Sequence, residues 1–123
     1  MSARTTTQPI PRAQRVYVVA MGAIIGGAFA YAACDWGTWT HLAYLPLQGG
    51  FAMGTRFGGI AMHYYGLVLW GLGGLAAGAG LGAVACAIWR RPWPQTALRV
   101  LGAWAIAAVL LAGSYFTWSL WPW

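Results

Sequence analysis

The charged residues divide the chain into long uncharged segments, and this pattern constrains its fold more than any other feature. A membrane-spanning helix needs about 20 mainly apolar residues. Three uncharged segments are long enough to hold one such helix each, and they cover residues 16–34, 57–89 and 100–123. The pattern therefore predicts three spans in one chain.

The composition supports this prediction. Charged residues make up 7% of the chain and hydrophobic residues 60%, whereas soluble domains carry about 25% charged residues. A soluble globular domain is excluded because its surface could not be kept hydrated, and ordinary disorder is excluded because it requires low hydrophobicity. Asp35 is the sole acidic residue of the chain, so acid–base catalysis by two carboxylates is excluded as well.

We therefore predict an all-α membrane protein in which a basic amino-terminal segment, 1–15, precedes one membrane domain, 16–123. Residues between the first two spans include Pro46, Gly49 and Gly50, and irregular backbone cannot be satisfied in lipid. We expect this stretch to be an interfacial outer loop. The expected boundaries are about 16–34, 58–88 and 100–121 for the spans, 35–57 for the outer loop and 89–99 for the inner loop.

The arginines predict an orientation. Arg56 shares the outer loop with Asp35, whereas the other six arginines precede the first span or lie between the second and third. Under the positive-inside rule, the amino terminus and the 89–99 loop are cytoplasmic and the carboxyl terminus is periplasmic. We expect a multi-pass protein of a bacterial inner membrane. The net charge of +6 indicates attraction to anionic lipids. The arginines form only short, sparse clusters, which argues against nucleic-acid binding.

Tryptophan and small residues predict how the spans sit and pack. Aromatic belts mark membrane interfaces, and the expected interface anchors are Trp36, Trp39, Trp89, Trp93, Trp118 and Trp121. Small residues at four-residue spacing let two helix backbones approach closely. Such ridges occur at Gly22, Gly26 and Ala30, and again at Gly74, Gly78 and Gly82. The predicted contact lies within the chain or with another subunit.

His63 is the best candidate for chemistry, because polar residues at membrane depth are functional hypotheses by default. It could ligate haem or (bacterio)chlorophyll or contact a quinone. Tyr64 and Tyr65 follow it in sequence, and Arg56, seven residues before it, is expected on roughly the same helical face. The alternative is an interfacial histidine hydrogen-bonded to a neighbour. A haem with two histidine ligands would need the second from a partner subunit, since His41 lies in the predicted loop.

A metal site on the outer side is a further candidate. His41, His63 and Met53 are residue types that copper accepts, although none of them has a tight metal-ligand spacing. Asp35 and Arg56 flank the outer loop and could pair across its base, but we expect them instead to set the loop geometry or to meet a partner. Residues 16–29 followed by Ala30-Tyr31-Ala32 also have the pattern of a cleaved signal peptide, but we expect the first span to be retained.

The three-span plan, with one histidine in the second span, is similar in size and topology to the membrane anchors of succinate dehydrogenase. That resemblance implies a haem-ligating role for His63. In those anchors an acidic residue follows the histidine, whereas no acidic residue follows His63 in this chain. The residues therefore assign the chain to no family.

Three hypotheses for function remain. The first is a small non-catalytic subunit that packs in and stabilises a multi-subunit, energy-transducing membrane complex, respiratory or photosynthetic. The second is a redox membrane anchor that contributes His63 to a haem b, (bacterio)chlorophyll or quinone site. The third is a small oligomeric transporter, which the absence of a carboxylate in all three spans disfavours. A stand-alone enzyme is not expected, and no cofactor is required by the first hypothesis.

Overall fold

The computed structural model describes residues 8–120 and contains three long helices and one small β-hairpin. The helices are α1 (Arg12–Trp36), α2 (Tyr64–Ile88) and α3 (Gln95–Leu120), and the strands are β1 (His41–Leu45) and β2 (Gly50–Gly54). All three helices are long and apolar enough to cross a membrane. The prediction of three such helices is confirmed.

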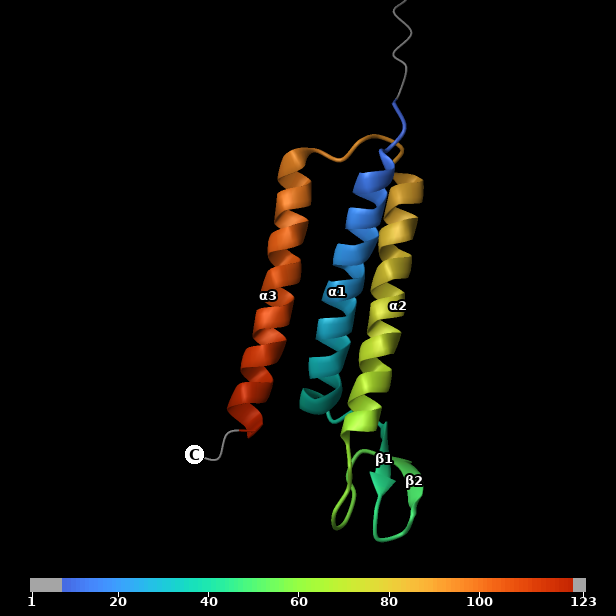
Figure 1. The fold of residues 1–123 in the computed structure, drawn as a ribbon, viewed down its shortest axis with the longest axis vertical. Coiled ribbons are helices and arrows are strands. Elements are labelled where there is room, and N and C mark those ends of the chain that lie inside the picture. The colour runs from blue at the N-terminus through green and yellow to red at the C-terminus, as the bar shows by residue number, and fades with distance from the viewer. Residues whose placement is uncertain (1–7, 121–123) are drawn as a thin grey trace, which may run out of the picture.

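The helices stand side by side, with α1 between α2 and α3 (Figure 1). Each has 25 or 26 residues, which corresponds to about 37–39 Å at 1.5 Å per residue. That length exceeds a hydrocarbon core of about 30 Å. Large apolar side chains along the bundle are exposed, including Leu81, Leu111 and Trp104, as expected where lipid rather than water surrounds a helix.

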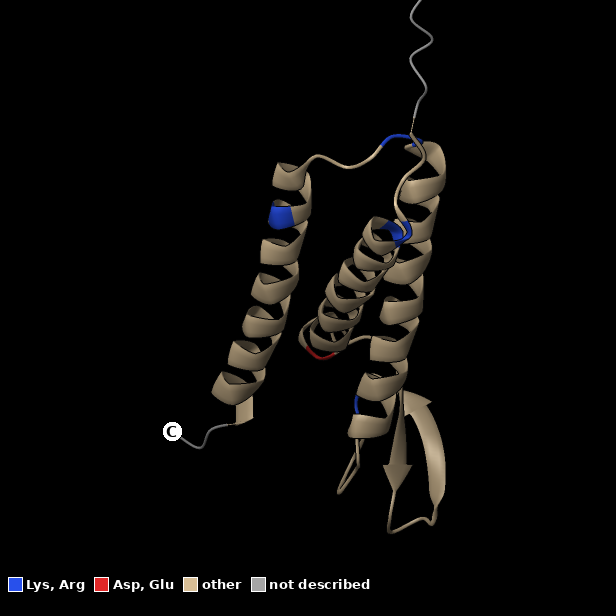
Figure 2. Cartoon of the chain, turned by 45° about the horizontal axis from the view of Figure 1, so that its top comes forward, with Lys and Arg blue, Asp and Glu red and all other residues tan. Residues whose placement is uncertain are grey.

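The charges lie at the two ends of the bundle (Figure 2). The arginine end holds the start of α1 and the α2–α3 connection, with Arg12, Arg15, Arg90 and Arg91. The opposite end, which we call the hairpin end, holds β1, β2 and Asp35. Arg4 lies outside the described residues. The expected separation of the charges between two ends is therefore seen for the arginines that the structure describes.

Close approach of two glycine ridges holds α1 against α2. A Cβ atom placed on Gly22 would lie 2.5 Å from the carbonyl oxygen of Gly78, and one on Gly26 or Gly74 would overlap the carbonyl oxygen of the other residue. Two helix backbones can come this close only where side chains are absent. Of the two alternatives left open by the sequence, the structure shows the contact within the chain. Its residues are Gly22, Gly26, Ala30, Gly74, Gly78 and Gly82.

The segment expected to be an irregular outer loop, 35–57, instead contains the antiparallel hairpin of β1 and β2. His41 pairs with Gly54 and Leu45 with Gly50, and Gly49 takes the positive φ of 63° that the turn requires. The prediction was wrong because the proline and glycine residues suggested a backbone without hydrogen-bond partners, whereas pairing of the two strands satisfies the backbone hydrogen bonds. In β1 burial alternates along the strand, with His41, Ala43 and Leu45 buried. The sequence does not show this alternation, because Leu42 and Tyr44 between them are also apolar.

The helix boundaries also differ from the predicted spans. The second helix begins at Tyr64 rather than near 58, because Met62 forms a β-bridge with Tyr44 and Gly59 has a φ of 87°. The 89–99 loop is shorter than expected, since α3 begins at Gln95. Proline is well suited to a helix start, and the carbonyl of Pro94 accepts a hydrogen bond from the Leu98 amide.

Candidate functional site

The hairpin brings His41 beside His63, which the sequence had left in separate elements. His41 opens β1, and His63 is the residue just before the first turn of α2. Their Nε2 and Nδ1 atoms lie 2.9 Å apart in a hydrogen bond. The Nδ1 of His41 lies 2.7 Å from the carbonyl oxygen of Trp39. The candidate site is therefore a hydrogen-bonded pair of imidazoles that a backbone carbonyl anchors.

Packing holds the His41 ring in place. His41 is only 7% exposed, and its ring meets the ring of Phe57 edge-on at a centroid distance of 5.8 Å. Gly66 of α2 lies directly behind it, since a Cβ atom on Gly66 would be 2.5 Å from the Cβ of His41 and 2.7 Å from the carbonyl oxygen of Leu42. The hairpin can dock on α2 because position 66 has no side chain.

A second contact joins the hairpin to α2. The indole Nε1 of Trp70 donates a hydrogen bond of 3.0 Å to the carbonyl oxygen of Thr40, and its ring packs against Trp39. Because α2 begins at Tyr64, Trp70 lies in its second turn, where it fixes the strand that carries His41.

The structure separates the three residues proposed as a metal site. Met53 is paired with Leu42 in the hairpin, one position from His41, so it lies on the opposite face of the two strands. His41, His63 and Met53 therefore do not form one coordination sphere. Within residues 8–120, no group of three or more His, Cys, Asp or Glu side chains could hold a metal ion.

The pair also cannot hold a haem between its two rings. Metal–nitrogen bonds of about 2.0–2.1 Å place two trans nitrogens about 4 Å apart, whereas the nitrogens of His41 and His63 are 2.9 Å apart. His63 is exposed and could still serve as a single ligand. It is also hydrogen-bonded to a neighbour, as the alternative interpretation of this histidine expected.

Among the described residues, the other proposed cofactor-binding residues take no part in the hydrogen bonds of the pair. Tyr64 and Tyr65 stack on each other with a centroid distance of 4.1 Å, and Tyr65 meets Phe51 of β2 edge-on. Within residues 8–120, no ion pair links Arg56 to Asp35; the carboxylate of Asp35 instead accepts a hydrogen bond of 2.8 Å from the hydroxyl of Tyr115. The alternative of an Asp35–Arg56 pair is therefore not seen in this part of the chain.

The tryptophans proposed as interface anchors lie near the two ends of the bundle. Trp36 and Trp39 lie at the hairpin end of α1, and Trp89 packs against Trp93 between α2 and α3 with a centroid distance of 5.8 Å. Trp118 lies near the end of α3 and is 70% exposed. The backbone amide of Trp93 donates to Gln14 of α1 at 2.9 Å. Trp121 lies outside the described residues.

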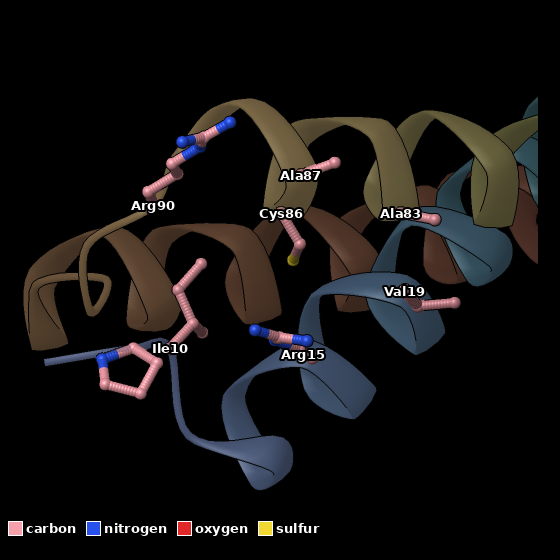
Figure 3. Close-up of a pocket in the computed structure, with 8 residues that line it drawn as sticks. Ile10, Arg15, Val19, Ala83, Cys86, Ala87 and Arg90 are labelled. Carbon is pink, nitrogen blue, oxygen red and sulfur yellow. The ribbon is translucent and has the colours of Figure 1, made fainter.

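A pocket of about 620 Å³ opens at the arginine end, between α1 and α2. Figure 3 shows the side chain of Arg15 reaching into the space between these helices, near Cys86, while Arg90 lies at the end of α2. Val19, Ala83 and Ala87 form apolar parts of the wall. This pocket combines cationic groups with an apolar surface, and no motif in the sequence predicted it.

Comparison with known proteins found no matching protein family, no matching curated protein and no matching solved structure.

Proposed function

We propose that this protein is a small non-catalytic integral subunit that packs against a larger membrane protein within a multi-subunit, energy-transducing complex. The observation that carries the proposal is a second row of small residues on α2, which faces away from α1. We call this row the outer stripe. Its members, Gly73, Ala76 and Gly80, recur at intervals of three and four residues, and all are exposed.

The outer stripe is separate from the ridge that α1 uses. At about 100° per residue, Gly80 lies about 160° around the helix from Gly78, and Ala76 lies about as far in the other direction. A Cβ atom on Gly73 or Gly80 would meet nothing within 4 Å in the described structure. Alternating three- and four-residue spacing is the repeat of a left-handed helix pair, and small residues favour such pairing in lipid.

The arrangement of the other helices leaves this face free. The third helix lies on the far side of α1 from α2 (Figure 1), so within residues 8–120 it does not cover the outer stripe. A partner helix is therefore the expected occupant, because lipid chains do not require a row of glycine and alanine.

Native-gel analysis of gently solubilised membranes tests the proposal. We expect the chain to migrate in a particle much larger than its 13.1 kDa, together with at least one larger membrane protein. Gly80→Leu places a side chain on the outer stripe and should release the chain from the particle. Gly113→Leu is the matched control, since Gly113 of α3 also faces open space. Migration as a lone monodisperse protein would refute the proposal, and particles of this chain alone would favour the oligomeric transporter.

A redox role is the second candidate function, and the His41–His63 pair favours it. The energy-transducing part of the proposal depends on this pair, because a packing subunit by itself needs no cofactor. The absorption spectrum of the purified complex should change on His63→Ala if this residue binds haem, (bacterio)chlorophyll or quinone. Unchanged haem bands and unchanged quinone kinetics would remove the redox role and leave the packing role intact.

The orientation and the lipid partner belong to the same proposal. We infer that the arginine end faces the cytoplasm of a bacterium and that the hairpin end faces the periplasm, since cytoplasmic loops carry an excess of arginine. Basic pockets between helices on that side bind anionic lipid head groups. The pocket at Arg15 and Arg90 has this character, with apolar wall for an acyl chain.

A further inference from the structure

Donor and acceptor rules determine where the hydrogens of the two histidine rings lie. A backbone carbonyl oxygen can only accept, so the Nδ1 of His41 must donate to the Trp39 oxygen, 2.7 Å away. The Nε2 of a neutral His41 then carries no hydrogen and can only accept. The Nδ1 of His63, which lies 2.9 Å from it, must therefore be the donor.

This hydrogen-bond chain leaves one nitrogen with an open lone pair. A neutral His63 with its hydrogen on Nδ1 has a bare Nε2. Among the described residues, the His63 ring forms its hydrogen bond through Nδ1, and the residue is exposed.

A histidine in this arrangement resembles those that bind metals in proteins. Metal-bound histidines almost always donate their other ring N–H to a nearby acceptor, which fixes the tautomer and the ring orientation. Here that acceptor is His41, and Trp39 fixes the tautomer of His41 in turn. Phe57 packs against both rings, at centroid distances of 5.8 Å and 5.5 Å. The His63 ring is therefore held in one orientation, with its hydrogen on Nδ1. Its Nε2 lone pair is left free to bind a metal.

The kind of metal follows from the number of ligands. Residues 8–120 contain no cluster of three or more potential His, Cys, Asp or Glu ligands, so they do not complete a tetrahedral site. A metal tetrapyrrole supplies four equatorial nitrogens itself and needs only one axial imidazole from a protein chain. Exposed apolar side chains close to His63 in sequence, Ile60 and Tyr64, offer surface for a macrocycle.

We propose that Nε2 of His63 is the axial ligand of a metal tetrapyrrole and that His41 is a positioning residue, which fixes the tautomer of His63 from the carbonyl of Trp39. This proposal deepens the redox candidate by naming the ligand atom and the ligand class. It does not depend on the outer stripe or on a partner helix, so the two can fail separately.

Titration of the full chain in detergent with zinc protoporphyrin tests this inference, with metal-free protoporphyrin as the control for apolar binding. Zinc protoporphyrin should bind with the red-shifted Soret band of an axially ligated metal. His63→Gly should lose that shift, and free imidazole should restore it. His41→Phe retains His63 as the ligand but removes the acceptor that orients its ring. The affinity for zinc protoporphyrin should therefore fall about 10- to 100-fold, the usual cost of losing such a partner. His41→Gln, which can again accept from His63 Nδ1, should recover part of the loss.

Circular dichroism and the chromatographic profile of each variant show whether the helices still form. His41→Gln keeps a polar acceptor at a buried position, so the comparison survives if His41→Phe fails to fold. Equal affinities for the zinc and metal-free porphyrins, or a Soret shift that persists in His63→Gly, would overturn the proposal. Equal affinities in the wild type and a folded His41→Phe variant would overturn the positioning role.

Discussion

The hydroxyl of Tyr115 donates a hydrogen bond of 2.8 Å to the carboxylate of Asp35, and this contact ties α3 to α1 at the hairpin end. At the arginine end, the hydroxyl of Tyr17 in α1 donates to the carbonyl oxygen of Leu98 at 3.0 Å. These two tyrosines therefore connect the same pair of helices near both ends. The single acidic residue of the chain serves helix packing here.

Tyr115→Phe removes the contact with Asp35 while keeping the ring. We expect the chain to lose about 0.5–1.5 kcal/mol of stability, since hydrogen bonds between membrane helices contribute about this much. Thermal unfolding in detergent measures the loss. Thr117→Val is the control, because the Thr117 hydroxyl bonds to Gly113 within α3. An equal loss in both variants would show that Tyr115 does not connect the helices.

Gly78→Ala should separate α1 from α2. A Cβ atom at this position would overlap the carbonyl oxygen of Gly22, whereas one on Gly80 in the same helix would meet nothing within 4 Å. We expect a loss of about 1–3 kcal/mol for Gly78→Ala, as in other overpacked sites, and little change for Gly80→Ala in the isolated chain. Unfolding in detergent measures both. Equal stabilities for the two variants would contradict the observed glycine contact.

Gly66→Ala should displace the hairpin from α2, because the added methyl group would press on His41 and the carbonyl of Leu42. The Trp39–Trp70 contact should weaken as a consequence, and tryptophan fluorescence should report it. Gly58→Ala changes a glycine in the segment before α2 that has open space around it. The same spectral change in both variants would mean that Gly66 does not hold the hairpin.

Arg15→Gln should weaken the binding of anionic phospholipid at the arginine end. The expected effect is a several-fold loss of phosphatidylglycerol retained by the protein, measured by native mass spectrometry in mixed phosphatidylglycerol–phosphatidylcholine micelles. Arg99→Gln removes the same charge from α3, and Arg99 does not line the pocket. Similar losses in both variants would indicate general charge attraction rather than a site, and inorganic phosphate competing equally well would argue against a lipid.

The sequence predicted the three helices because runs of apolar residues and breaks by charge depend on local composition alone. It also identified both glycine ridges, since their four-residue spacing is visible in the chain. It did not predict the hairpin, whose strands are short and whose pairing depends on contacts with α2. The His41–His63 contact was beyond reach for the same reason, because it joins residues 22 positions apart through that hairpin.

Asp35 illustrates a second limit. Its charge and position suggested a partner of opposite charge in the same loop, Arg56, but the structure gives it a tyrosine that lies 80 residues away. The residues of a helix that face a neighbour are fixed by the rotation of both helices, and the low amphipathicity of spans in lipid leaves that rotation undetermined in the sequence. In the sequence, only the small-residue ridges indicate this rotation, and they do so for α1 and α2 but not for α3.

Photo-crosslinking from the outer stripe in native membranes tests the central claim most directly. A benzoylphenylalanine in place of Ala76 faces away from α1, and one in place of Leu111, an exposed residue of α3, serves as the comparison. We predict an adduct between the Ala76 variant and a larger membrane protein, with a much lower yield from Leu111. An Ala76 variant that crosslinks only to lipid, or only to a second 13.1 kDa copy of this chain, would contradict the account.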